Sequence, residues 1–145
     1  MKVNKLSLTF SSVPENVTIA RMLASSLGAQ LDLPINELEE LKVAVSEAVS
    51  NAIIHGYSNN PDNFVTLEFE ASSEKLRIDV IDQGCGIPDV KQAMQASFST
   101  DPERMGLGFI FMQSFMDELR VQSEVGKGTK VSMVKNLKNI YPSSH

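Results

Sequence analysis

Apolar residues recur at two different spacings along this chain, and the spacings separate expected strands from expected helices. Spacings of three and four predict one helix from Ser12–Glu15 to about 28–31 and a second from 34–37 to about 54. The stretch Ser12-Val-Pro-Glu15 also resembles a capping box with proline in the first turn. Alternating apolar residues and β-forming residue types predict five strands, over 3–10, 64–71, 76–82, 119–124 and 129–135. Two further helices are expected over 89–94 and 107–117.

The order of these elements predicts the fold class. Residues 72–75 and 125–128 connect successive strands as hairpins, so those strands should be antiparallel neighbours. With the helices gathered on one face, the chain is expected to form a two-layer α+β sandwich. No repeat or long linker divides the 145 residues, which predicts a single domain over 1–145. Residues 97–103 should form a mobile loop, and the tail over about 138–145 should fray.

The second helix carries three polar residues on one face. Glu47, Asn51 and His55 are spaced four apart, so they should stack along that face. Polar residues at this spacing usually mark only the solvated side of an amphipathic helix. Asparagine, however, is a poor residue for a helix interior, because its amide competes for the backbone. A carboxylate and an amide one turn apart can serve a metal-bound anionic ligand.

Two glycine motifs follow further along the chain. Asp82-x-Gly84-x-Gly86 ends a strand, where glycine permits close approach of a ligand and the carboxylate can accept from an exocyclic amine. Gly106-x-Gly108 opens a helix, whose free amides can bind phosphate. Each motif alone is weak: the first equally fits a turn capped by aspartate, and the second a flexible loop exit. Neither matches a dinucleotide fingerprint or a P-loop.

Arg104 and Thr129 lie beside these motifs. Arg104 precedes the second glycine pair, where its guanidinium could stabilise a terminal phosphate, although a surface arginine is the commoner case. Thr129 follows Gly128 at a strand start and can offer a hydroxyl to a ligand or serve as a β-branched strand residue. The only histidines are His55 and His145 and the only thiol is that of Cys85, so no zinc site or Ser-His-Asp triad is expected.

Composition narrows the class of partner. The net charge is −5, from 13 basic and 18 acidic side chains without a basic cluster, which disfavours nucleic acid and is more compatible with a basic protein. No run approaches the roughly 18 apolar residues of a membrane span. The N-terminus lacks the apolar core of a signal peptide, and a single cysteine forms no internal disulfide. These features together predict a cytoplasmic protein.

The motifs taken in order resemble the Bergerat ATP-binding fold of gyrase, histidine kinases and MutL. The set is Glu47-x-x-x-Asn51, Asp82-x-Gly84-x-Gly86, Gly106-x-Gly108 and Gly128-Thr129. The stretch from Val45 to Tyr57 is similar to the small anti-sigma serine kinases of Gram-positive bacteria, and most of all to their sporulation branch. The resemblance covers about 8–137 and implies a mostly antiparallel sheet with the helices on one face.

This resemblance implies an ATP and Mg²⁺ site and a role for each end of the second helix. Asn51 would hold Mg²⁺, which bridges the phosphates of ATP or ADP. Glu47 would be the general base that takes the proton from a substrate serine. Asp82 would bind the adenine amine, with Thr129 nearby.

The same resemblance assigns the glycines and the loop before the last helix. Gly84 and Gly86 would line the adenine pocket, and Gly106 and Gly108 would wrap the phosphates. Residues of about 88–105 would form an ATP lid, in which Arg104 would contact the γ-phosphate. This lid is about two residues shorter between 102 and 104 than the family pattern.

The resemblance also implies protein partners. The family members bind an RNA polymerase sigma factor, here sigma F, as a homodimer that uses the first helix. The phosphorylated serine would belong to an anti-anti-sigma protein. Arg21 matches an arginine used for both partners, whereas Val17 stands where an acidic residue is expected. No direct contact with nucleic acid or a membrane is implied.

Three alternatives remain open at this point. The chain could be a general-stress anti-sigma kinase, or a nucleotide-gated anti-sigma module with negligible kinase activity. It could also be a detached histidine-kinase ATPase domain, which would require a phospho-acceptor histidine on a dimerisation helix. No such segment is expected before residue 47.

Overall fold

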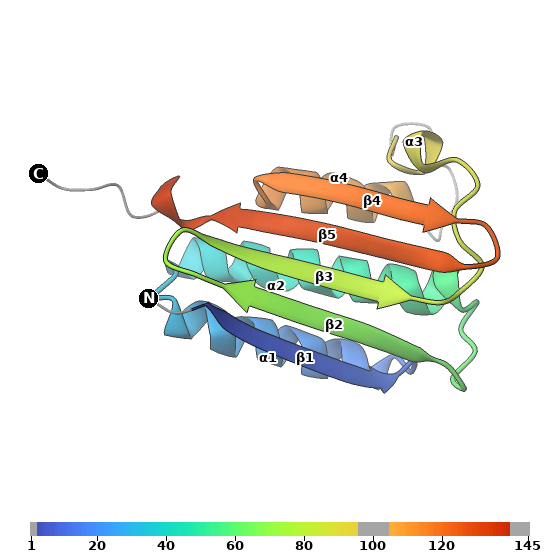
Figure 1. Cartoon of the computed structure of the whole chain (residues 1–145), viewed down its shortest axis with the longest axis horizontal. Helices are drawn as coiled ribbons and strands as arrows, with labels where there is room; N and C mark the ends of the chain where they lie inside the picture. The colour runs from blue at the N-terminus through green and yellow to red at the C-terminus, as the bar shows by residue number, and fades with distance from the viewer. Residues whose placement is uncertain (1–2, 96–104, 140–145) are drawn as a thin grey trace, which may run out of the picture.

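The computed structural model describes residues 3–95 and 105–139. Its sheet has five strands in the order β1-β2-β3-β5-β4, and every neighbouring pair is antiparallel. Three helices, α1, α2 and α4, form a second layer on one face of this sheet (Figure 1). The strands are β1 Asn4–Ser11, β2 Phe64–Ala71, β3 Lys75–Asp82, β4 Glu118–Glu124 and β5 Gly128–Asn136. The helices are α1 Glu15–Gln30, α2 Ile35–Asn51, η1 Ala52–Gly56, α3 Val90–Ala93, α4 Met105–Phe115 and η3 Leu137–Asn139.

The predicted two-layer α+β sandwich is therefore confirmed, and its core lies between the two layers. In α2 the apolar residues that recur at spacings of three and four form a stripe that faces the sheet, with Leu41, Val45 and Ala48 at most 1% exposed. Alternate residues of the strands meet it from the other side. Fully burying one such large apolar side chain contributes roughly 1.5–3 kcal/mol. Hydrophobic burial therefore fixes which face of each central strand the helices cover.

The N-terminal part of α1 differs from the sequence expectation in two ways. Ser12 does not cap the helix: its hydroxyl donates to the carbonyl of Asn60 at 2.7 Å, and α1 begins after Pro14 without a side-chain cap. The reason is that Ser12 is buried at the end of β1, where the turn before β2 supplies a partner. Ala20, Ala24 and Gly28 share the buried face of α1 with Leu27, whereas Met22 is 63% exposed.

The second expected helix changes its geometry near its end. The α-helix closes at Asn51, and a π-helix continues over Ala52–Gly56. π-helical turns are rare and occur often at functional sites. The last helix begins two residues earlier than expected, because α4 starts at Met105 and so includes Gly106 and Gly108 in its first turn.

One end of the sandwich gathers the chain segments that carry the predicted motifs. The last residues of α2 and β3 and the first residues of β5 and α4 all lie at the end where α3 is found (Figure 1). Short α3 is capped by Asp89, whose carboxylate accepts from the amide of Gln92 at 3.1 Å. The expected mobile loop over 97–103, half of the expected lid and most of the expected tail lie outside the described residues.

Candidate functional site

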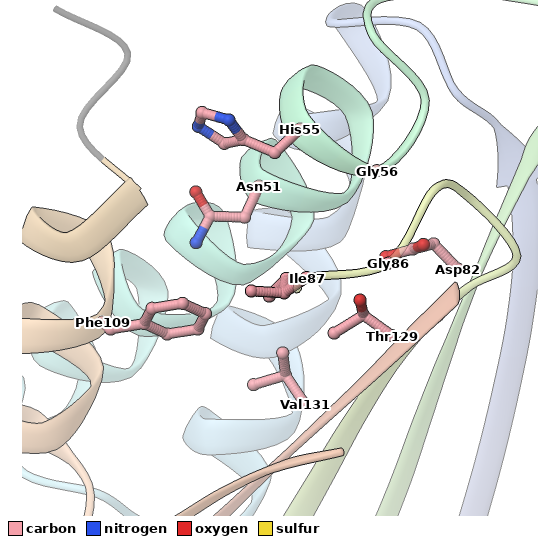
Figure 2. A pocket seen from close by; sticks show the side chains of 9 residues that line it. All are labelled: Asn51, His55, Gly56, Asp82, Gly86, Ile87, Phe109, Thr129 and Val131. Atoms are coloured by element: carbon pink, nitrogen blue, oxygen red, sulfur yellow. The ribbon is translucent and has the colours of Figure 1, made fainter. Parts of the chain in front are cut away.

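A pocket opens at this end of the sandwich, and four separate segments build it. The helix end contributes Asn51, and the turn after β3 contributes Gly86 and Ile87 (Figure 2). Its lining combines apolar side chains with polar ones. The lining residues are Asn51, His55, Gly56, Asp82, Gly86, Ile87, Phe109, Thr129 and Val131. Such a pocket suits a flat apolar ring that carries a polar substituent.

Asp82 supplies the carboxylate of this pocket. It is the last residue of β3 and is 7% exposed, and its Oδ1 accepts from the amide of Gly84 at 2.9 Å. Burial raises the pKa of Asp82, while hydrogen bonds from the amides of Gly84 and Thr129 lower it. The carboxylate is thus anchored by backbone amides and is available to accept a bond from a ligand amine.

Thr129 faces the same pocket from β5 and belongs to a small hydroxyl network. Its Oγ1 lies 2.7 Å from Oγ of Ser123 on β4. Ser123 Oγ also accepts from the amide of Ile87 at 2.7 Å. This network ties the turn after β3 to the β4–β5 hairpin, and Ser123 had no signal in the sequence beyond its place in a strand.

The glycines after β3 are needed for close backbone contacts. A Cβ on Gly84 would stand 2.0 Å from the carbonyl oxygen of Gly56, which accepts from the amide of Cys85 at 2.9 Å. Gly86 has φ +78°, and a Cβ there would meet the carbonyl oxygen of Glu124 at 2.3 Å. Gly86 lines the pocket as expected. Gly84 instead lies behind it, against the π-helix.

Glu47 and Asn51 lie together beside the first turn of α4. A Cβ on Gly108 would stand 2.9 Å from Oε2 of Glu47 and 3.3 Å from Nδ2 of Asn51. Burial raises the pKa of Glu47, which moves this carboxyl toward the range of a general base at neutral pH. Gly106 belongs to the same turn of α4. The first four amides of a helix have no partner within it, so they are suited to bind phosphate.

Asn51 has an unmet hydrogen-bonding group. Its Nδ2 is buried without a partner among the described residues. Within residues 3–95 and 105–139, no group of three or more histidine, cysteine or acidic side chains could hold a metal ion. Mg²⁺ commonly takes one or two protein ligands together with phosphate oxygens and water. The unpaired Nδ2 can donate to an anionic oxygen such as that of a phosphate, and Oδ1 of the same amide is an oxygen ligand of the kind that Mg²⁺ takes.

Of the other sequence-predicted residues, Arg21 and Val17 lie away from this pocket. Arg104 falls outside the described residues. Arg21 is exposed on α1 and lines a separate groove with Thr18, Met22, Ser25, Ser26 and Lys42. Val17, also on α1, packs partly buried against the core. Sequence reasoning missed the apolar wall of Ile87, Phe109 and Val131, since their periodicity indicates only core positions.

His55 and Cys85 were left without a role by the sequence. His55 lines the pocket from the π-helix. Cys85 is a free cysteine on the exposed turn. Its thiol donates to the carbonyl of His55 at 3.1 Å. This contact joins the turn to the helix end, next to the Gly56–Cys85 backbone bond.

Comparison with protein families identifies the domain. Residues 10–135 match the histidine kinase-like ATPase domain. Two solved structures share the fold: the RsbU and RsbW domains of a Mycobacterium tuberculosis protein, with TM-score 0.64 and 19% identity, and a histidine kinase domain from Erythrobacter litoralis, with TM-score 0.59 and 22% identity. The Mycobacterium structure aligns with 91% of this chain, and the alignment covers 31% of that structure's own chain. The Erythrobacter structure aligns with 88% of this chain, and the alignment covers 65% of its own chain. In the described part of the chain, no helix is sufficiently long and apolar to span a bilayer.

Curated relatives are much closer in sequence. The anti-sigma F factor of Clostridium beijerinckii is 46% identical over 93% of this chain and 96% of its own length. The anti-sigma F factor of a Thermoanaerobacter strain is 48% identical over 91% of this chain and 93% of its own. The anti-sigma F factor of Geobacillus kaustophilus is 46% identical over 92% of this chain and 93% of its own length. The chain therefore belongs to the family of anti-sigma F factors, which carries the histidine kinase-like ATPase domain.

Proposed function

We propose that this chain binds a sigma factor of the sigma F type and inhibits it, and that it is also an ATP-dependent protein-serine kinase acting on an anti-anti-sigma protein. The observation that carries the kinase assignment is the placement of Glu47 and Asn51 against Gly108, beside a pocket that ends in Asp82. Relatives named anti-sigma F factors support the sigma partner. The proposed role in sporulation rests on the resemblance of residues 45–57 to the sporulation branch of the anti-sigma kinases.

In this proposal adenine occupies the pocket. Its ring would lie against Ile87, Phe109 and Val131, and its exocyclic amine would donate to Asp82. Thr129 would stand beside that amine. Asp82→Asn should weaken ATP binding, because an amide presents the amine with one acceptor oxygen and a competing donor. Calorimetry with ATP and with GTP measures this, and unchanged ATP affinity in the variant would remove Asp82 from the site.

The phosphates would extend from the adenine toward the first turn of α4. Gly106 and Gly108 leave the backbone amides there accessible. Oδ1 of Asn51 would hold the magnesium ion, while its buried Nδ2 would donate to a phosphate oxygen. Mg²⁺ supplies neutralisation of the phosphate charge when it is bound. Arg104 would contact the γ-phosphate as part of the lid over about 88–105, by its match to the family motif.

Phosphoryl transfer would then depend on Glu47. Its carboxylate accepts the proton of the substrate serine hydroxyl while the serine oxygen forms a bond to the γ-phosphorus. The bond from the γ-phosphorus to the bridging oxygen breaks, and ADP leaves with that oxygen. A pKa raised by burial makes Glu47 a stronger base than an exposed glutamate.

The kinase assignment is tested with γ-labelled ATP and an anti-anti-sigma protein as acceptor. The wild-type chain should place acid-stable label on serine. Glu47→Gln should lose activity by roughly 10²-fold or more while it retains ATP binding. Glu40→Gln, the same change elsewhere on α2, is the matched control. Full transfer by Glu47→Gln would refute the base role, and no transfer by the wild type would leave a nucleotide-gated binding module.

The sigma assignment is tested separately, by capture of sigma subunits on the immobilised chain with and without ATP. We expect sigma F to be retained by an ATP-loaded homodimer. Arg21→Ala should weaken that retention, because Arg21 is exposed on α1 and lies outside the nucleotide pocket. Capture of a general-stress sigma factor instead would assign the chain to the other branch of the anti-sigma kinases.

A further inference from the structure

The side chain of Tyr57 lies behind the nucleotide pocket and joins two chain segments by hydrogen bonds. It follows the π-helix and is only 8% exposed. Its hydroxyl donates to the carbonyl of Phe64 at 2.6 Å and accepts from the amide of Gln83 at 2.7 Å. A phenol has one donor proton and can also accept, so both bonds form at once.

The amide that Tyr57 holds belongs to the peptide unit after Asp82. Rotation of that peptide unit would turn the strand end that carries the Asp82 carboxylate. The carboxylate itself has little free space on one side, because a Cβ on Gly56 would stand 2.8 Å from Oδ1 of Asp82. Tyr57 therefore fixes the aspartate through the backbone, and its side chain is not among those that line the pocket.

The surroundings keep the Tyr57 hydroxyl protonated beside this carboxylate. Burial raises the pKa of Tyr57, the Gln83 amide lowers it, and the charge of Asp82 raises it. A neutral phenol can continue to donate to the Phe64 carbonyl while it accepts from Gln83. A phenylalanine would fill the same space but would leave both the carbonyl and the amide without this partner.

We propose that Tyr57 is a positioning residue for purine selection: its hydroxyl holds the peptide after Asp82 so that the carboxylate faces the exocyclic amine of adenine. The inference rests on the proposed function, because it requires that Asp82 reads a bound adenine. It predicts that removal of one oxygen atom outside the pocket changes which purine the pocket prefers.

The test compares ATP with purine riboside triphosphate, which lacks the exocyclic amine. In Tyr57→Phe we expect the Kd for ATP to rise about fivefold to twentyfold, in line with the loss of roughly one to two hydrogen bonds. The Kd for the analogue should change much less, so the preference for ATP should fall at least threefold. A purely structural role would weaken both ligands equally, and an unchanged preference in a folded variant would overturn the proposal.

Two further measurements keep the outcomes separate. Tyr141→Phe removes the other tyrosine hydroxyl of the chain and should leave the preference unchanged. If Tyr57→Phe does not fold, amide hydrogen exchange on the unmodified protein tests the bond, because a Gln83 amide that exchanges as fast as a free peptide would overturn the proposal. A wild-type chain that binds ATP no better than the analogue would instead refute the proposed adenine site itself.

Discussion

Gly108 lies directly against Glu47: a Cβ built on Gly108 would stand 2.9 Å from Oε2 of that carboxylate. The first turn of α4 and the last turns of α2 are therefore in contact at the point where catalysis is proposed. Because Oε2 is the far end of a flexible side chain, an added methyl group can displace it without moving backbone. The glycine thus leaves room for one particular position of the carboxylate.

This contact predicts the behaviour of Gly108→Ala. Alanine favours a helix over glycine by up to about 1 kcal/mol, so the melting temperature should not fall. The displaced Glu47 should lower phosphoryl transfer by roughly 10- to 100-fold, which is the scale of effect of a misplacement near 1 Å. Single-turnover transfer and thermal unfolding measured on the same sample check both statements. Normal transfer would show that the position of Glu47 is not critical.

The buried charge of Glu47 predicts a pH dependence of stability. Burial raises its pKa above the ordinary 4.5, so the folded state binds this proton more tightly than the unfolded state. The stabilising contribution of the proton is fully present below the unfolded pKa and is lost as the pH rises through the folded pKa. At pH 7 the ionised carboxylate therefore lowers the free energy of unfolding.

Glu47→Gln removes that charge at nearly constant volume. The variant should be more stable than the wild type at pH 7, and the difference should shrink as the pH falls below the ordinary value of 4.5. Urea unfolding of both proteins across this range gives the measurement, with Glu40→Gln as the control on the same helix. A wild type that is the more stable protein at pH 7 would contradict the desolvation argument.

The layers of the fold could be predicted from periodicity, because the side chains that form them repeat at fixed spacings. The stripe of α2 through Leu41, Val45 and Ala48 is an example, and it is buried as expected. The face of α1 was harder to predict. There Ala20, Ala24 and Gly28 share the contact with Leu27 while Met22 remains exposed, so large apolar side chains alone do not mark the buried face.

The candidate site was predictable only where a short motif itself supplies the residue, either through its side chain or through a glycine that a tight turn needs. Asn51, Asp82, Gly86 and Thr129 do line one pocket. The contribution of Tyr57 depends on hydrogen bonds to Phe64 and Gln83, which lie 7 and 26 residues away along the chain. No local pattern encodes such long-range pairings. The sequence also gives no signal for the π-helix η1 after α2, because residues 52–56 continue an ordinary helical pattern.

The close approach of Gly84 to Gly56 predicts a large loss of stability in Gly84→Ala. The added Cβ would stand 2.0 Å from a backbone carbonyl oxygen, and no side-chain rotation can relieve that contact. We expect destabilisation of about 2–3 kcal/mol, typical of overpacking that moves backbone.

Gly126→Ala is the control for Gly84→Ala, because its effect has a different cause. Its Cβ would meet nothing within 4 Å, but φ is +82°. The left-handed conformation should cost about 1–2 kcal/mol for alanine and leave ATP binding unchanged. Chemical unfolding measures the free energy of unfolding of both variants, and Gly84→Ala should show the larger loss. Equal losses would show that the turn yields to the Gly84 clash.

Ser123 does not line the pocket, yet we expect its substitution to affect nucleotide binding. Its hydroxyl accepts from the Ile87 amide and lies 2.7 Å from Thr129 Oγ1, so it links two walls of the pocket. Ser123→Ala leaves the Ile87 amide without its partner, which should cost about 1–3 kcal/mol of stability. The affinity for ATP should also fall, because Ile87 and Thr129 both lose their hydrogen bond to the Ser123 hydroxyl. Ser132→Ala, the same change on the outward-facing side of β5, should affect neither quantity, and equal effects of the two variants would remove Ser123 from the proposed network.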